Sequence, residues 1–180
     1  MRLSGGELRS RTLHVPSGRS YRPTPGRVKE ALFSIVGARV EEARVLDLFA
    51  GSGALGFEAL SRGARAATFV ERDPRTAMRI RAAARGFGLK DRVTVVCAPA
   101  ERATRALAGP FDLVFADPPF ALGLPHAILA GLLERGALEP EALIVYERPA
   151  RAEEVEFTGL RTERTARYGD VALQFLSLQA

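Results

Sequence analysis

The stretch 44-RVLDLFAGSGALGFEALSRG-63 decides the fold of this 180-residue chain. Residues 44–50 are short and apolar, as in a buried strand, and residues 54–63 have the pattern of a helix. Between them, Gly51, Gly53 and Gly56 spell G-x-G-x-x-G. Glycines let the backbone turn sharply and approach a ligand, and the following helix offers free N–H groups. The stretch therefore predicts a ligand-binding βα unit, although nucleotide-binding oxidoreductases share the spacing.

Outward from this unit, strands and helices keep alternating. Further strands are expected at 66–71, 92–97, 111–116 and 142–147, and helices at 74–88, 100–109 and 124–136. This alternation predicts βαβ units and a parallel sheet. Residues 160–178 instead read as two strands around Tyr168-Gly169-Asp170, which predicts an antiparallel hairpin at the sheet's edge. We expect a Rossmann-like α/β fold with a mostly parallel, seven-stranded sheet.

Acidic residues stand at the ends of the first two strands. Ligands of such sheets bind outside the carboxyl ends of the strands. Asp47 lies before the glycine loop, where a carboxylate suits a ligand with a positive ammonium group better than a pyrophosphate. Glu71 ends the second strand, where an acidic side chain can accept both ribose hydroxyls. Asp73 precedes Pro74 and is better explained as the N-cap of the next helix.

The fourth strand ends in the second informative stretch, 111-FDLVFADPPF-120. Asp117 follows a run of apolar residues, so we expect it to point into the same crevice as Asp47. Its carboxylate and the Pro118 carbonyl can together accept both hydrogens of an exocyclic amine. Pro119 has no N–H and stiffens the turn, and Phe120 can stack on a base. A plain strand-ending turn would not explain the inward carboxylate.

The first 39 residues carry the chain's basicity. They hold eight Arg or Lys and two Glu, a net charge of +6, whereas the whole chain is +5. Phosphate backbones are the usual partner of such a segment, and a solubilising arm is the alternative. A Gly5-Gly6 pair suggests a hairpin, and 24–37 reads as a helix with Thr24 as its cap, Pro25 at its first position and Gly37 at its end. The candidate RNA-contacting side chains are Arg9, Arg11, Arg22 and Arg27.

Composition excludes several classes of protein. No apolar run reaches the length of a membrane span, and the N-terminus has no signal-peptide core. A single cysteine, Cys97, and two histidines, His14 and His126, give no disulfide and no metal-ligand set. We therefore expect a cytoplasmic protein without a metal.

Three segments together resemble a known family. They are 22-RPTPGRVKEALF-33, 46-LDLFAGSGALGFEALSRGA-64 and 112-DLVFADPPF-120. They are similar to the bacterial 16S rRNA guanine-N2 methyltransferases of the RsmD type, and the resemblance covers nearly the whole chain. It implies a Rossmann-like methyltransferase domain at 40–180 behind a basic extension at 1–39. It also implies methyl transfer from S-adenosylmethionine to the guanine conventionally numbered 966.

The resemblance also implies roles for individual residues. Asp47 and the loop of Phe49, Ala50, Gly51, Ser52 and Gly53 would hold the methionine part of the cofactor, and Glu71 its ribose. The target amine and base would lie against Asp117, Pro118, Pro119 and Phe120. Many such enzymes bind adenine with an Asp or Asn after the third strand, where this chain has Pro99. Adenine would then rest on the Ala100 backbone and apolar walls, with Arg72 nearby.

Other functions compete with this interpretation. An NAD(P)-dependent oxidoreductase would need an acid or base for hydride transfer, and His14 and His126 are poor candidates. A non-catalytic RNA-binding module would not need an intact glycine loop and Asp117. A DNA adenine-N6 or protein glutamine-N5 target is the closer rival. The sequence leaves open whether naked rRNA, an assembly intermediate or the small subunit is the substrate, and whether Asp117 takes the proton or only orients the amine. We expect a monomer.

Overall fold

The structure, a computed structural model, describes residues 1–13, 25–119 and 125–179. Three features predicted from the sequence lie outside these residues: the cap at Thr24, the RNA contact at Arg22 and the stacking ring of Phe120.

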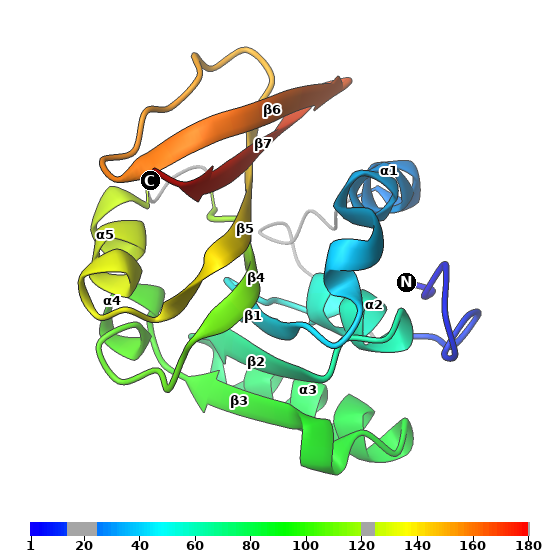
Figure 1. The fold of residues 1–180 in the computed structure, drawn as a ribbon. Helices are drawn as coiled ribbons and strands as arrows, with labels where there is room; N and C mark the ends of the chain where they lie inside the picture. The colour runs from blue at the N-terminus through cyan, green and yellow to red at the C-terminus, as the bar shows by residue number, and fades with distance from the viewer. Residues whose placement is uncertain (14–24, 120–124, 180) are drawn as a thin grey trace.

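A seven-stranded sheet runs through the molecule in the order β3-β2-β1-β4-β5-β7-β6 (Figure 1). The first five strands in sequence pair in parallel, whereas β7 is antiparallel to both β5 and β6. The predicted Rossmann-like sheet with its antiparallel C-terminal hairpin is therefore confirmed. The strands are β1 (Arg44–Leu48), β2 (Ala66–Glu71), β3 (Val93–Cys97), β4 (Phe111–Ala116), β5 (Leu138–Pro149), β6 (Leu160–Tyr168) and β7 (Val171–Leu178).

Helices cover both faces of the sheet (Figure 1). On one face, α1, α2 and α3 contribute to a buried cluster with β1 and β4, and on the other, α4 and α5 pack with β4 and β5. The helices are α1 (Gly26–Val36), α2 (Ala54–Ser61), α3 (Pro74–Gly86), α4 (Ala100–Ala103) and α5 (His126–Glu134), with 3₁₀ turns η1 (Gly37–Val40) and η2 (Lys90–Arg92).

Several predicted boundaries were wrong. The helix expected at 100–109 is a single turn, α4, because the chain leaves the helix after Ala103 and Leu107 turns into the core. Pro25 is the N-cap of α1 rather than its first helical residue, since its ψ of 142° is extended. β5 is longer than the predicted 142–147, because pairing with both β4 and β7 extends it at its two ends.

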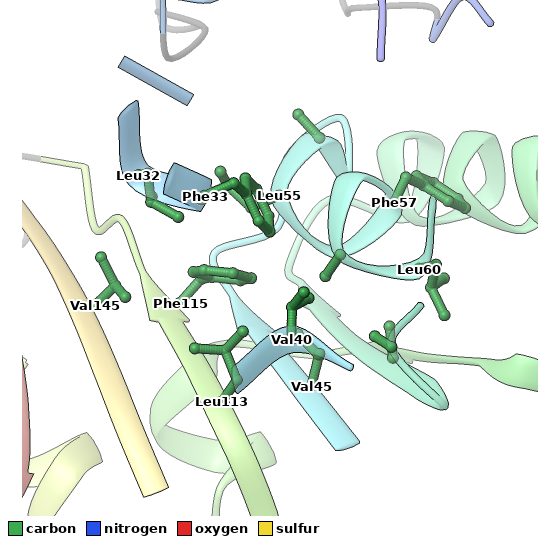
Figure 2. Close-up of a cluster of buried hydrophobic side chains, with 14 of the residues drawn as sticks. Leu32, Phe33, Val40, Val45, Leu55, Phe57, Leu60, Leu113, Phe115 and Val145 are labelled. Atoms are coloured by element: carbon green, nitrogen blue, oxygen red, sulfur yellow. The ribbon is translucent and has the colours of Figure 1, made fainter. Parts of the chain in front are cut away.

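α1 packs on the sheet beside the carboxyl end of β4. Figure 2 shows Phe33 and Leu55 directed toward Phe115 of β4, and the rings of Phe33 and Phe115 meet edge to face with centroids 5.6 Å apart. All three side chains are buried. Burying large apolar side chains is the main stabilising contribution here, at roughly 1.5–3 kcal/mol each. The basic extension is thus fixed to the main domain through a shared core.

The N-terminal segment is anchored by a buried carboxylate, Glu58 of α2. The Ser4 and Gly5 N–H groups donate to it at 2.9 and 2.8 Å. Lys29 of α1 forms an ion pair with it at 2.6 Å, and Arg62 donates to it at 2.9 Å. Because Lys29 is only 1% exposed, this lysine adds nothing to the basic surface expected of residues 1–39.

The Gly5-Gly6 hairpin expected in this segment is reduced to one antiparallel bridge, between Arg2 and Thr12. Within the described part of the chain, no helix is long and apolar enough to span a bilayer, and no cluster of residues could hold a metal ion.

Candidate active site

The glycine loop begins two residues earlier than the sequence predicted. Phe49 has a positive φ of 59°, so the backbone turns away from the sheet directly after Leu48. Gly51 and Gly53 follow with φ of 55° and 77°, a region that side chains disfavour. The Gly53 N–H donates to the Ala50 carbonyl at 2.7 Å and closes the turn. The strand is shortened because a non-glycine residue makes the first left-handed step.

Gly56 lets α2 approach β1 and β2 closely. A Cβ at this position would lie 2.4 Å from the Phe69 ring and 3.2 Å from the carboxylate of Asp47. The Gly56 N–H donates to that carboxylate at 2.9 Å. The third glycine of the pattern therefore packs the helix against the strand and orients Asp47.

Asp47 is a buried carboxylate at the carboxyl end of the sheet, as predicted, and it is 3% exposed. Burial raises its pKa from 3.8 to about 8; the hydrogen bond from Gly56 opposes this rise, and the charge of Glu71 adds to it. A carboxylate held this way gains from a cation placed against it.

Glu71, at the end of β2, holds the glycine loop. One of its oxygens accepts the Gly51 N–H at 2.8 Å, and the other accepts the Asp73 N–H at 2.8 Å. The sequence predicted a ribose-binding role and missed this tether between β2 and the loop. Asp73 caps α3 as predicted, accepting from the Thr76 N–H at 2.8 Å. The hydrogen bonds that Asp73 accepts from Thr76 lower the pKa of Asp73.

Asp117 lies where β4 ends, beside Glu147 of β5. Burial raises its pKa well above 3.8, and the charges of Glu147 and then Asp47 raise it further. Asp117 is therefore within electrostatic reach of both carboxylates, and the crevice that it is expected to share with Asp47 stays a prediction. Pro118 is buried and Pro119 is exposed. The sequence did not single out Glu147, because this residue lies within a predicted strand. Only the pairing of β4 with β5 reveals that it flanks Asp117.

The region expected to receive adenine lies after β3. Pro99 caps α4 without a side-chain hydrogen bond, and Ala100 is buried. The Ala98 N–H donates to the Glu71 carbonyl at 3.1 Å, which joins this turn to β2. Arg72 is exposed beside it. The described residues 97–100 of this turn include no Asp or Asn, and the expected adenine contact stays a prediction.

The arginines expected to contact RNA are exposed but stand apart. Arg11 lies over the Phe87 ring at 5.5 Å and donates to the Gly86 carbonyl, at the C-terminal end of α3. Arg27 lies at the start of α1, with Nη2 3.7 Å from where a Cβ on Gly169 would stand. Arg9 is exposed in the N-terminal segment. Arg27 is therefore near the β6–β7 turn, whereas Arg11 packs at the far end of α3.

The carboxyl edge of the sheet thus gathers negative charge. Asp47, Glu71 and Asp117 lie at or just beyond the carboxyl ends of β1, β2 and β4, and within the described ranges no basic side chain forms an ion pair with any of them. Such a set of hydrogen-bond acceptors suits a ligand that carries positive charge and hydroxyl or amine hydrogens.

Comparison with known proteins agrees with this geometry. Residues 1–177 match the family described as Conserved hypothetical protein 95. The ribosomal RNA small subunit methyltransferase D of Escherichia coli (strain K12) is 40% identical over 154 residues, which cover 82% of this chain and 74% of that protein. The solved structure of Escherichia coli yhhF is 33% identical, covers 100% of this chain and 98% of its own, and has a TM-score of 0.90. An RNA methyltransferase from Salinibacter ruber in complex with S-adenosyl-L-homocysteine shares the fold at 19% identity and a TM-score of 0.67, covering 87% of this chain and 94% of its own.

Proposed function

The chain belongs to the Conserved hypothetical protein 95 family, that of the RsmD-type enzymes, and we propose that it methylates small-subunit ribosomal RNA with S-adenosylmethionine as cofactor. The proposed acceptor is the exocyclic N2 amine of one guanine in 16S rRNA, at the position conventionally numbered 966. The proposed substrate, ribosomal RNA or a small-subunit particle, places its action in the cytoplasm.

One observation carries the proposal: the carboxyl ends of β1, β2 and β4 gather carboxylates that form no ion pair within the described residues. Asp47 has a pKa of about 8 because it is buried and near Glu71. A ligand with an ammonium group would stabilise its charged form. S-adenosylmethionine carries an ammonium, a sulfonium and two ribose hydroxyls, and it fits this set of acceptors. A dinucleotide would instead bring a pyrophosphate to the glycine loop beside Asp47, which like-charge repulsion disfavours, whereas Glu71 could accept the ribose of either cofactor.

The protein's own residues position the reactants. When bound, the cofactor supplies an electrophilic methyl group on a sulfonium. Asp47 would hold its ammonium, and Glu71, already fixed by the Gly51 and Asp73 N–H groups, would meet its ribose. The glycine loop and the turn at Pro99 and Ala100 would enclose the rest. Alignment of this kind accounts for a large part of the rate enhancement in group-transfer enzymes.

Asp117 and Pro118 would hold the target amine. The N2 lone pair of guanine is delocalised into the ring, so the free amine is a weak nucleophile. Hydrogen bonds from both amine hydrogens, to the Asp117 carboxylate and the Pro118 carbonyl, favour a more tetrahedral nitrogen with its lone pair directed at the methyl group. Asp117 in its charged form can then accept the departing proton. The base must leave its stack to reach this position, at a cost of a few kcal/mol.

The proposal is tested with tritium-labelled S-adenosylmethionine against 16S rRNA, small subunits, DNA and a protein mixture. We expect label in 16S rRNA or its particles, recovered as N2-methylguanosine after digestion, and no label with Asp117→Ala. Label recovered as N6-methyladenosine in DNA, or in protein glutamine, would contradict the proposed acceptor while keeping the cofactor. Failure of S-adenosylhomocysteine at millimolar concentration to raise the melting temperature would contradict the cofactor.

A further inference from the structure

A cavity lies beside the proposed amine site. It is a partly open cavity of about 500 Å³ at the carboxyl ends of β4 and β5, a volume within the roughly 300–1,000 Å³ of small-molecule sites. Pro118, Tyr146 and Arg148 line it from the strands, and His126 lines it from the start of α5. Since Pro118 also belongs to the proposed amine site, the cavity borders that site at this residue.

Arg148 is buried, and the nitrogens that carry three of its five N–H donors have no partner within the described part of the chain. The residue is 1% exposed. Its Nη1 donates to the carbonyls of Ala152 and Pro149, at 2.5 and 3.3 Å. Its Nε and Nη2 have no hydrogen-bond partner within the described part of the chain. Buried guanidinium groups are nearly always paired, because leaving their N–H groups unsatisfied is unfavourable. The unused edge of Arg148 therefore indicates a ligand.

The geometry of that edge limits the ligand. Nε and Nη2 lie on the same side of a guanidinium and form a two-pronged fork, which binds two adjacent acceptors. A phosphate or a carboxylate would satisfy it, but Glu153, Glu154 and Glu156 also line the cavity. Their negative charges disfavour an anion. A neutral group with two adjacent acceptors remains, and O6 and N7 of guanine are the pair that arginine binds in this way. Adenine has a donor in place of O6 and does not fit.

The position of Tyr146 connects the fork to the amine site. Tyr146 pairs with Ala116, the residue before Asp117, across β4 and β5. Burial raises the pKa of Tyr146, the charge of Arg148 opposes this rise, and the charge of Asp117 adds to it. Tyr146 thus lies within electrostatic reach of both groups. Ala116 and Tyr146 belong to the buried cluster on one face of the sheet and Phe115 and Val145 to the cluster on the other, so the alternation directs Arg148 to the first face and Asp117 to the second. A base that lies across the carboxyl edge at Pro118 would have its amine at Asp117 and its other edge at Arg148.

We propose that Arg148 selects guanine by donating from Nε and Nη2 to O6 and N7 of the target base in this cavity. The inference rests on the proposed function, because it assigns the specificity of the same site. It makes Arg148 a specificity-determining residue: it recognises the edge of the base opposite the amine, while Asp117 acts on the amine itself.

The test compares two target bases in two forms of the protein. The RNA carries either guanosine or 7-deazaguanosine, which keeps the N2 amine and lacks the N7 acceptor, at the methylated position. With the wild-type protein, kcat/KM should fall about tenfold for the 7-deaza base, the lower end of the effect of a bidentate pair. Arg148→Met should be slower on guanosine and should lose nothing further on 7-deazaguanosine. Arg151→Met, at an exposed arginine nearby, is the control and should behave as the wild type.

Equal wild-type rates on the two bases would overturn the inference, and this holds even where Arg148→Met does not fold. A tenfold loss that persists unchanged in a folded Arg148→Met would also overturn it, because N7 would then be read elsewhere. If the protein methylates another acceptor and does not methylate the guanosine RNA, the proposed function is contradicted, and this inference with it.

Discussion

At the scale of single residues, the site depends on two carboxyl groups, the buried Asp47 and the partly buried Asp117. Asp47 and Asp117 both have raised pKa values because burial and neighbouring negative charges disfavour ionisation. A cationic ligand reverses that balance. The same burial that makes these residues unfavourable in the free protein therefore favours binding of the cofactor and poises Asp117 as an acceptor.

Replacing Asp117 separates orientation from proton acceptance. Asp117→Ala should reduce turnover at least ~100-fold, the effect of losing a positioned acid–base group. Asp117→Asn keeps one acceptor oxygen and should recover part of that loss. Wild-type turnover should also rise with pH, because Asp117 accepts only after losing its proton, and the Asn variant should lose this rise. Single-turnover rates from pH 5 to 9 measure both effects. Asp91→Ala, at an exposed position, is the control. A fully active Asp117→Ala would mean that the "ADPPF" stretch has only a structural role as a turn.

Asp47 makes the stability of the free protein depend on pH. Its folded pKa of about 8 exceeds the ordinary 3.8, so the folded state holds a proton that the unfolded state releases. The free energy of unfolding should be highest below about pH 4 and fall as pH rises to about 8. Between pH 5 and 8.5, wild-type Tm should fall at least about 5 °C more than that of Asp47→Asn. Differential scanning fluorimetry measures this, and parallel curves for the two proteins would contradict it.

At the scale of elements, one carboxylate joins three segments of the chain. Glu58 receives hydrogen bonds from the N-terminal segment, from α1 and from its own helix. Burial opposes its charge, but the Lys29 and Ser4 hydrogen bonds outweigh burial and lower its pKa. The basic extension is therefore held in place by a buried ion pair together with the apolar contacts of α1.

Removing this carboxylate should be costly. Glu58→Ala leaves Lys29 buried without its counter-charge, which should lower the free energy of unfolding by about 3–5 kcal/mol. Glu163→Ala is the matched control, because Glu163 pairs with Arg39 at 3.4 Å on the surface, with side chains 31% and 51% exposed. That change should cost less than about 1 kcal/mol. Urea denaturation measures both. Equal losses would mean that burial does not distinguish the two pairs.

At the scale of the whole molecule, the proposed RNA surface should follow the carboxyl edge of the sheet. The crevice, the start of α1 and the β6–β7 turn all lie there, since β5 and β7 pair up to Pro149 and Val171. Arg11 packs instead on Phe87 at the end of α3. Among the described arginines that the sequence proposed, Arg27 is thus the one nearest the site, and it is expected to contribute most to the salt-dependent binding of RNA.

Replacing Arg27 should change how RNA binding depends on salt. Arg27→Ala should reduce the slope of log K against log salt by about 1, the effect of losing one phosphate contact. Arg135→Ala is the control, because it is an exposed arginine between α5 and the start of β5, at the amino edge of the sheet. Fluorescence anisotropy with labelled 16S rRNA fragments measures both slopes. An unchanged slope for Arg27→Ala would favour the solubilising role for this end of the chain.

Periodicity and the chemistry of near neighbours were enough to predict the succession of strands and helices along the chain, the glycine turn with Asp47 before it and the cap at Asp73. A short stretch of sequence contains all the groups on which these features depend. The roles of residues that act through distant partners required the folded structure. The tether from Glu71 to Gly51, the pairing of Lys29 with Glu58, the approach of Glu147 to Asp117 and the unused edge of Arg148 join segments that are brought together by strand register and burial. The sequence does not distinguish a charged residue that is buried with a partner from one that faces water. These roles can therefore be recognised only in the folded sheet.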